Sequence, residues 1–329
     1  MISGNLEFVL EMSVPEQSAA EKSTRDDFTV APVSPVLGAE VIGLDVSRPL
    51  DPPTLTVVRD AFQDHHVLCF RDQRLDDDQL VAFSKQFGPL EAFPEKDKTK
   101  GKIEVYNVAN VSPEGEHLAE DDPRVIFQRN NARWHTDSSY RYVPSLASIM
   151  YGLEVLPEDA EGGETGFSNM LAAYAALPED MRAQLEPLHQ VHSYADIRRL
   201  EPAMPAMIAE ERDALPPVTH PVIRVHPDRG WRRSLYFTSN TSLEIGGMTL
   251  EEGKELHRWL VEHVSRPEFC YFHRWRPGDL VMWDNRVLLH RAIAYDYARY
   301  RRVLRRTTVA GGGPIMGPFW PEAREAAGG

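Results

Sequence analysis

The sequence of 329 residues contains only two cysteines, Cys69 and Cys270. Two cysteines provide no disulfide framework and no cysteine-based metal site, and because each lies in an apolar run we predict two buried, unpaired thiols. No apolar run approaches the roughly 18 residues that a membrane span needs. The first residues carry glutamates without a basic flank, so no signal peptide is predicted either. We therefore expect a cytoplasmic protein.

Basic residues are also in deficit. Lys and Arg number 36 against 50 Asp and Glu, which leaves a formal net charge of −14. An acidic chain is repelled by nucleic-acid phosphates and by anionic lipids, so neither a nucleic acid nor a membrane surface is expected as the main partner. The expected partner is a small molecule, and an anionic one would need a local basic patch. The oligomeric state, a homo-oligomer included, is left open.

The remaining composition is that of a globular chain, with 42% hydrophobic and 26% charged residues. Residues 1–28 show no sustained period, and we predict a disordered or mobile N-terminal tail there. A single domain is expected over residues 29–329. The sequence contains no glycine-rich phosphate loop and no nucleophile elbow, which argues against nucleotide-binding and hydrolase folds.

Short strands dominate the predicted secondary structure, with a few helices between them. Helix signals occur over 52–65, 76–87, 170–188 and 248–264, a buried strand is predicted over 67–70, and 222–225 with 234–237 are predicted to form a hairpin. Many short strands with helical insertions are typical of a β-sandwich or barrel covered by helices. The predicted fold class is therefore mainly β with flanking helices.

Two His-x-Asp triplets occur in the sequence, and their contexts differ. His226 and Asp228 lie in a Pro-Asp-Arg-Gly turn sequence, so Asp228 is interpreted as a turn residue. His135 and Asp137 lie in Arg-Trp-His-Thr-Asp-Ser-Ser, where a spacing of two on an extended segment points both side chains to one side. With one more ligand, such a pair makes the 2-His-1-carboxylate face that leaves iron positions open. A hydrogen-bonded core histidine is the alternative interpretation.

A third ligand and a basic segment come late in the sequence. His290 follows a predicted turn, strand and turn, and on spacing alone a core histidine is preferred there to a metal ligand. Residues 299–306 contain five arginines interleaved with Val and Leu, and we predict a strand on which Arg302 and Arg306 share one face. An arginine that points into a half-buried sheet needs a carboxylate partner, and a bound dicarboxylate would serve bidentately.

Together these segments resemble the Fe(II)/2-oxoglutarate-dependent dioxygenases of the taurine and 2,4-dichlorophenoxyacetate dioxygenase type, the TauD/TfdA family. The matching stretches occur in family order and spread over residues 33–320. They are Trp134-His-Thr-Asp-Ser-Ser, Gly162-Gly-Glu-Thr165, Leu171-Ala-Ala-Tyr-Ala-Ala-Leu-Pro178, Trp283-Asp-Asn-Arg286 with His290-Arg-Ala292, and Arg301-Arg-x-x-Arg-Arg306. The resemblance implies a double-stranded β-helix, the cupin-like jelly roll, with flanking helices. It also implies an enzyme that uses Fe(II), 2-oxoglutarate as cosubstrate, and O2.

The resemblance further assigns an iron site and part of a cosubstrate site. The implied Fe(II) ligands, which are also the catalytic residues, are His135, Asp137 and His290. Thr165 and Arg302 are implied to bind the distal carboxylate of 2-oxoglutarate.

The register of the arginine strand leaves a choice. Counting from Asp296 selects Arg302 and Arg306, and Arg306 would then face the substrate or the other end of the cosubstrate. Counting from the distal histidine selects Arg301 and Arg305 instead. We prefer the first count because turns absorb insertions more readily than strands do.

The implied reaction hydroxylates a C–H bond of the substrate and releases succinate and CO2. Taurine-specific relatives carry a histidine in the segment that corresponds to 87–93, which here has none and contains an added acid, so taurine is disfavoured. The serines after Asp137 and the threonines after Arg306 are similar to the phenoxyacetate type. They imply a small, carboxylate-bearing and largely apolar substrate.

Several alternatives remain. A tailoring hydroxylase of a larger natural-product acid, such as a terpenoid, fits the same residues, and so does a dioxygenase that degrades aryloxyalkanoates or sulfonates. A non-oxidative zinc or manganese enzyme would have no use for Thr165 and the paired arginines. A metal-free binding protein on the same fold would not need all three ligands.

Overall fold

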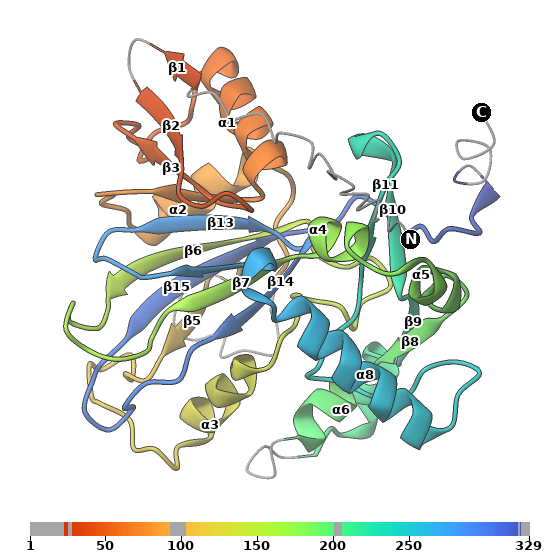
Figure 1. Cartoon of the computed structure of the whole chain (residues 1–329). Helices are drawn as coiled ribbons and strands as arrows, with labels where there is room; N and C mark the ends of the chain where they lie inside the picture. Colours follow the sequence, from red (N-terminus) through yellow and green to blue (C-terminus); the bar gives the residue numbers. More distant parts are fainter. Residues whose placement is uncertain (1–22, 26–27, 93–102, 201–205, 322, 324–329) are drawn as a thin grey trace, which may run out of the picture.

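Eight strands form the main sheet, in the order β1-β2-β3-β4-β13-β6-β15-β5 (Figure 1). The computed structural model describes residues 23–25, 28–92, 103–200, 206–321 and 323. Neighbouring strands are antiparallel except β3 and β4. In chain order the strands are β1 (Ser23–Arg25), β2 (Phe28–Pro32), β3 (Ala39–Ile42), β4 (Val67–Phe70), β5 (Tyr106–Ala109), β6 (Ala147–Glu154), β13 (Leu280–Asp284) and β15 (Val303–Val309).

A smaller sheet of three strands packs against the main one, and two ribbons extend beyond it (Figure 1). The smaller sheet has the order β12-β7-β14, and each ribbon is an antiparallel pair. Its strands are β7 (Thr165–Asn169), β12 (Cys270–His273) and β14 (Leu288–Ala292). The ribbons are β8 (His189–His192) with β9 (Val218–Pro221), and β10 (Ile223–His226) with β11 (Arg232–Leu235).

The central strands of the main sheet are buried on both faces, because successive side chains of a strand point to opposite sides. On β13, Leu280 and Met282 join one hydrophobic cluster, whereas Val281 and Trp283 join another. The second cluster fills the space between the sheets, where the rings of Phe167 and Trp283 lie 5.6 Å apart. The buried strand predicted at β4 follows the same pattern and is confirmed.

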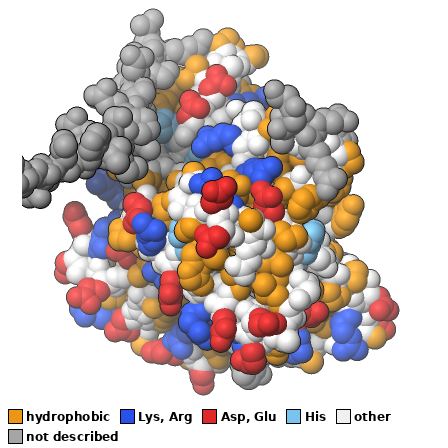
Figure 2. All heavy atoms as spheres, turned by 45° about the vertical axis from the view of Figure 1, so that its right-hand side comes forward, with side chains coloured by type: hydrophobic (Ala, Val, Ile, Leu, Met, Phe, Trp, Pro, Cys, Tyr) orange, Lys and Arg blue, Asp and Glu red, His pale blue; other side chains and the backbone are white. Residues whose placement is uncertain are grey.

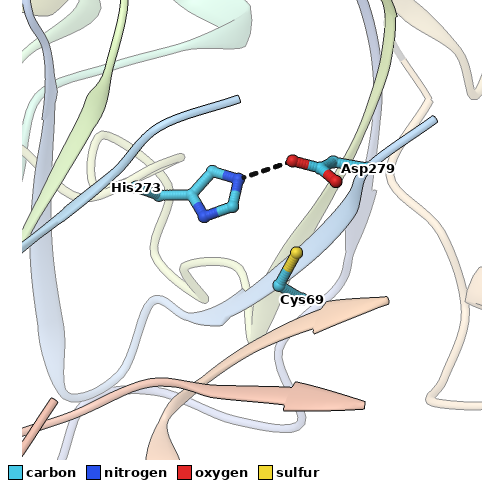
Figure 3. A group of neighbouring side chains, drawn as sticks. All are labelled: Cys69, His273 and Asp279. Carbon is cyan, nitrogen blue, oxygen red and sulfur yellow. Dashed lines mark hydrogen bonds and ion pairs between the residues drawn. The ribbon is translucent and has the colours of Figure 1, made fainter. Parts of the chain in front are cut away.

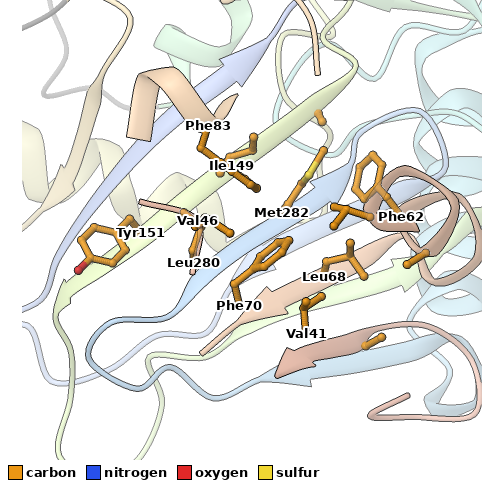
Figure 4. Close-up of a cluster of buried hydrophobic side chains, with 14 of the residues drawn as sticks. Val41, Val46, Phe62, Leu68, Phe70, Phe83, Ile149, Tyr151, Leu280 and Met282 are labelled. Carbon is orange, nitrogen blue, oxygen red and sulfur yellow. The ribbon is translucent and has the colours of Figure 1, made fainter. Parts of the chain in front are cut away.

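Helices α1 (Pro52–His65) and α2 (Asp77–Lys85) cover the outer face of the main sheet (Figures 1 and 4). Phe62 of α1 and Phe83 of α2 belong to the same cluster as Phe70, and the rings of Phe70 and Phe83 make an edge contact at 5.4 Å. This outer layer buries the β-sheet face that does not point into the barrel.

The longest described helices each have a capping side chain at the N-terminus. Asp51, Asp76 and Thr249 each accept a hydrogen bond from the backbone N–H three residues on, ahead of α1, α2 and α8 (Leu250–Val264). At α2 and α8 the side chain at the third helical position accepts a hydrogen bond from the backbone N–H of the capping residue, as the capping-box pattern predicts. These predicted helices are confirmed, apart from a residue or two at their ends.

The prediction of one continuous helix over 170–188 is wrong. The structure has two helices there, α4 (Met170–Ala175) and α5 (Glu179–Leu185). Pro178 separates them, because proline offers no N–H for a helical bond and disfavours a helical conformation in the residue before it. The predicted hairpin is confirmed as β10 and β11, joined by the 3₁₀ turn η2 (Pro227–Arg229).

The remaining helical segments are short and lie between the strands. They are α3 (Pro123–Arg129), η1 (Asn130–Ala132), α6 (Tyr194–Arg199), α7 (Ala209–Ala214) and η3 (Pro267–Phe269). Two facing sheets with helices on the outside make the predicted mainly-β jelly roll, and the fold prediction is confirmed.

The predicted tail over residues 1–28 falls mostly outside the described residues. Within that range the structure describes β1, which pairs with β2, and Phe28 at the start of β2. Among the described helices, none has the length and apolar character of a membrane span. On the face shown in Figure 2, basic side chains are interspersed with the acidic ones, so the negative net charge is not gathered into one patch there.

Candidate active site

His135, Asp137 and His290 lie together in the folded chain. His290 is on β14, and the other two are on the segment between η1 and β6. The backbones of His135 and His290 exchange two hydrogen bonds, of 3.0 and 2.8 Å, and their rings lie 4.2 Å apart. One ligand atom from each of the three side chains lies within 4.8 Å of the others, and all three residues are buried. The structure therefore brings together the residues that the sequence analysis selected from distant segments.

Both histidines present a nitrogen to a common space. Nδ1–H of His135 donates to the carbonyl oxygen of Arg133 at 2.8 Å, which leaves its Nε2 with a lone pair. Nε2 of His290 lies 3.6 Å from Oδ2 of Asp137. Burial lowers the pKa of each histidine, so both imidazoles are neutral at pH 7. Neutral imidazole is the form that binds a metal ion.

The carboxyl group of Asp137 is ionised. Burial alone would raise its pKa, but the charge of Arg306 and the hydrogen bond from Ser148 lower the pKa below its usual range. Nη1 of Arg306 donates to Oδ1 at 2.7 Å, and the hydroxyl of Ser148 donates to Oδ2 at 2.6 Å. The charged carboxylate is thus held at both oxygens.

Asn285 holds Ser148 in turn. Its side-chain nitrogen donates to the hydroxyl oxygens of Ser148 at 3.0 Å and of Ser145 at 2.9 Å, and its Oδ1 accepts from the indole of Trp283 at 3.0 Å. These buried hydrogen bonds fix the orientation of Asp137. Sequence reasoning missed Ser148 and Asn285. The sequence does carry a signal for Ser148, because it is a serine within the otherwise apolar first half of β6.

Thr165 and Arg302 both contact Trp275. The indole N–H of Trp275 donates to Oγ1 of Thr165 at 3.0 Å, and the guanidinium carbon of Arg302 lies 5.9 Å from the ring centre. Because Oγ1 already accepts this bond, the Thr165 proton is directed to another acceptor. Sequence reasoning missed Trp275, which becomes recognisable only when β12 is placed beside β7.

Arg302 is a buried cation with no anionic partner in the described part of the chain. The residue is 6% exposed, its Nη2 donates to the carbonyl oxygen of Gly163 at 3.2 Å, and its Nε has no hydrogen-bond partner. No carboxylate within the described ranges comes within ion-pair distance of it. A buried guanidinium in this condition is suited to pair with the carboxylate of a bound molecule.

Arg301 and Arg305 lie on the opposite side of the strand. Nε of Arg301 donates to Glu154 at 2.8 Å, and Arg305 forms an ion pair with Asp77 near the protein surface. The alternative register of the arginine segment would therefore select side chains that already have carboxylate partners outside the barrel. Arg302 points to the interior, in agreement with the preferred count.

Arg306 has an aromatic side chain on one side and an acidic residue nearby. Its guanidinium carbon lies 5.3 Å from the ring centre of Tyr106. Glu91 is buried, accepts a hydrogen bond from the hydroxyl of Ser138 at 2.7 Å, and has Nε of Arg141 3.5 Å away. Burial raises the pKa of Glu91, while these partners and Arg306 oppose the increase.

Two aromatic rings form an apolar wall behind His290. The ring of Trp283 lies 4.9 Å from the imidazole, and that of Phe167 lies 6.4 Å away. Both side chains are fully buried. They restrict the motion of the imidazole and keep water from its inner face.

The second His-x-Asp triplet lies elsewhere. Nε2 of His226 bonds to the hydroxyl of Ser234 at 2.8 Å, and Asp228 lies in the η2 turn as an ion-pair partner of Arg286. The interpretation of Asp228 as a turn residue agrees with this placement.

The chemistry of the first cluster fits an iron site. Two neutral imidazoles and one ionised carboxylate, each offering one donor atom, are the 2-His-1-carboxylate set. Three protein ligands leave positions open on the metal for other molecules. The unpartnered buried cation Arg302 and the hydroxyl of Thr165 fit one carboxylate of a dicarboxylic acid.

Comparison with known proteins supports this interpretation. The model of the taurine catabolism dioxygenase TauD, TfdA family matches residues 29–308. The chain is 36% identical to the α-ketoglutarate-dependent 2,4-dichlorophenoxyacetate dioxygenase of Cupriavidus pinatubonensis, over 84% of this chain and 96% of that protein. A more distant relative, pentalenolactone F synthase of Streptomyces arenae, is 29% identical over 90% of this chain and 99% of its own length.

A solved structure extends the comparison to three dimensions. The crystal structure of AAD-2 in complex with Mn(II) and N-oxalylglycine has a TM-score of 0.78 and 36% identity, covering 87% of this chain and 99% of that one. The chain therefore belongs to the taurine catabolism dioxygenase TauD, TfdA family, and it is an Fe(II)/2-oxoglutarate-dependent dioxygenase that uses O2.

Proposed function

We propose that His135, Asp137 and His290 hold the Fe(II) ion on one face. The proposal rests on the 4.8 Å limit within which their donor atoms lie, on their burial and on their protonation states. Thr165 and Arg302 bind the distal carboxylate of 2-oxoglutarate, because Arg302 is a buried cation for which the described part of the chain offers no anionic partner.

Arg306 faces the substrate, or the other end of the cosubstrate. When bound, the ferrous ion provides O2-dependent chemistry that converts 2-oxoglutarate to succinate and CO2 and places one oxygen atom in a substrate C–H bond. The chain contributes the geometry. Ser148 and Arg306 orient the carboxylate of Asp137, and the rings of Trp283 and Phe167 exclude water.

The substrate that the site supports best is a small, largely apolar carboxylic acid. The observation that carries this proposal is the guanidinium of Arg306 packed over the ring of Tyr106, because it pairs an anion-binding group with an aromatic surface. The dichlorophenoxyacetate relative acts on a molecule of this kind. A larger natural-product acid is the second candidate, since the match to pentalenolactone F synthase covers 90% of this chain and 99% of the synthase.

A screen of acids tests the substrate proposal. Aryloxyalkanoic, terpenoid, sulfonic and amino acids are incubated with enzyme, Fe(II) and 2-oxoglutarate, and substrate-dependent succinate is measured. We expect aryloxyalkanoic acids to give the largest increase. Arg306→Gln should raise the KM for the accepted acid by about 10- to 100-fold, because a charge-assisted hydrogen bond contributes about 1.5–3 kcal/mol.

Arg305→Gln is the matched control for this prediction. It removes an arginine one position away that pairs with Asp77 on the opposite side of the strand. The KM for the acid should stay within about twofold of the wild type, as is usual for an exposed ion pair. A larger effect from Arg305 than from Arg306, or a neutral amide that is turned over as well as the acid, would contradict the proposal.

Ser148→Ala should weaken metal binding. Its hydroxyl donates to Asp137 at 2.6 Å, and loss of a partner that orients a metal ligand typically costs about 10- to 100-fold in affinity. The affinity is measured by titration with Mn²⁺ followed by electron paramagnetic resonance. Ser168→Ala is the control, because Ser168 is equally buried and donates at 2.6 Å to a backbone carbonyl of Val264. Equal losses in the two variants would show that Ser148 acts on stability alone.

We also propose that residues 29–329 form one domain in a cytoplasmic protein. Strands that are far apart in the sequence, β2 and β15, belong to the same sheet, which supports a single unit. Both cysteines are free thiols, which is typical of a reducing compartment.

A further inference from the structure

A second group of metal-ligating side chains lies away from the active site. Cys69 is on β4, His273 is the last residue of β12, and Asp279 directly precedes β13. The active-site network reaches β13 at its other end, where Trp283 pairs with Ser148. That distance along an extended strand is about 13 Å. The two groups are therefore separate.

The second group has the geometry of a preformed cation site. One donor atom from each side chain lies within 4.8 Å of the others, and the exposed fractions of Cys69, His273 and Asp279 are 2%, 0% and 0%. The three side chains point toward one another (Figure 3). Nε2–H of His273 donates to Oδ2 of Asp279 at 3.1 Å, so an ion would replace this proton on Nε2 and take Oδ1, the other oxygen of Asp279, as its ligand. Oδ1 of Asp279 is buried and has no hydrogen-bond partner.

The outer atoms of these ligands are held by neighbouring groups. The hydroxyl oxygen of Tyr271 lies 3.1 Å from Nδ1 of His273, on the side of the ring away from Asp279. Oδ2 of Asp279 accepts from Nη1 of Arg71 at 2.6 Å and from the backbone N–H of Arg276 at 2.7 Å. Metal-binding histidines and carboxylates are oriented by this kind of outer contact.

The charges around the group balance with a divalent ion. Arg71 also forms an ion pair with Glu40, so these two side chains cancel and Asp279 leaves one negative charge. A deprotonated Cys69 adds a second negative charge, which a divalent cation neutralises. We propose that Cys69, His273 and Asp279 bind one Zn²⁺ ion. As the bonds to zinc form, Cys69 loses its S–H proton to solvent, and the proton of His273 moves from Nε2 to Nδ1, which then donates to the hydroxyl oxygen of Tyr271.

Zinc suits this group better than it suits the active site. A thiolate is a soft ligand that favours Zn²⁺, whereas the active-site triad offers only nitrogen and oxygen. Bound zinc would link β4, β12 and β13 at the end of the barrel. Cysteine spacing in the sequence did not indicate the site, because its three ligands come from separate strands.

Cobalt spectroscopy tests the proposal independently of the catalytic assignment. The full chain carrying His290→Ala, which removes one active-site ligand, is reduced, stripped of metal and titrated with Co²⁺. We expect a near-ultraviolet thiolate-to-cobalt charge-transfer band that saturates at one equivalent and disappears when Zn²⁺ is added. Cys69→Ser should abolish the band. Cys270→Ser, which removes the other thiol, should retain it.

A thermal measurement covers the case in which Cys69→Ser folds poorly. Zn²⁺ should raise the Tm of the stripped His290→Ala protein and of its Cys270→Ser derivative, and it should leave Asp279→Asn and Cys69→Ser unshifted. Absence of the thiolate band in the His290→Ala protein, or its persistence in Cys69→Ser, would overturn the proposal. Loss of oxygenase activity has no bearing on either result, so failure here leaves the iron assignment untouched.

Discussion

His290→Ala should reduce substrate-dependent succinate formation to below about 1% of the wild-type rate. Loss of a group that merely orients a metal ligand costs about 10- to 100-fold, and loss of the ligand itself exceeds that. The proposed iron site has no spare donor, because Asp137 and His135 are the only other ligand side chains within 4.8 Å among the described residues. Under anaerobic conditions, the visible charge-transfer band of the Fe(II)–2-oxoglutarate complex should also be lost.

His226→Ala is the matched control. His226 and His290 are both buried and both lie on strands, and the imidazole of His226 forms a hydrogen bond with the hydroxyl of Ser234. Substitution of His226 should lower stability by about 1–3 kcal/mol, as for other buried hydrogen-bonding groups, with little change in succinate formation by the folded enzyme. Equal losses in the two variants, corrected for the folded fraction, would mean that the triad is wrongly chosen.

The triad was predictable from the sequence because two of its members are adjacent in one motif. The spacing of His135 and Asp137 places both side chains on one side of an extended segment, and the third proposed ligand came from the family resemblance. The structure adds the reason that His290 reaches them, a direct pair of backbone hydrogen bonds with His135. No local pattern encodes that pairing, since it depends on how β14 is placed by the smaller sheet.

The supporting residues were not predictable in the same way. Ser148, Asn285 and Trp275 come from three strands or strand ends, and each acts through a partner that is distant in the sequence. Local signals also failed at residues 170–188, where the apolar spacing of a helix outweighed the helix-breaking effect of Pro178 in the prediction. Periodicity reports which face of a segment is buried, but it does not report what that face contacts.

Arg302→Met should strengthen the fold and weaken the cosubstrate complex at the same time. In the protein without cosubstrate, Arg302 is a buried cation with no carboxylate partner among the residues that the structure describes. Replacing buried ionic groups with apolar side chains of similar volume often stabilises by about 1–4 kcal/mol. For a domain of this size we expect the Tm to rise by about 2–10 °C in the absence of 2-oxoglutarate. The KM for 2-oxoglutarate should rise by at least about 100-fold, because two charge-assisted hydrogen bonds to its distal carboxylate are lost.

Arg301→Met separates this effect from a general loss of positive charge. Arg301 is next in the chain, but it pairs with Glu154 on the outer side, so both its Tm and its KM should stay near those of the wild type. Adding 2-oxoglutarate should then raise the Tm of the wild type and of Arg301→Met in proportion to the logarithm of its concentration, and leave Arg302→Met almost unshifted. A lower Tm for Arg302→Met with an unchanged response to 2-oxoglutarate would mean that the guanidinium serves the fold rather than the cosubstrate. The opposite signs of the two expected shifts make the assignment of Arg302 testable without knowing the substrate.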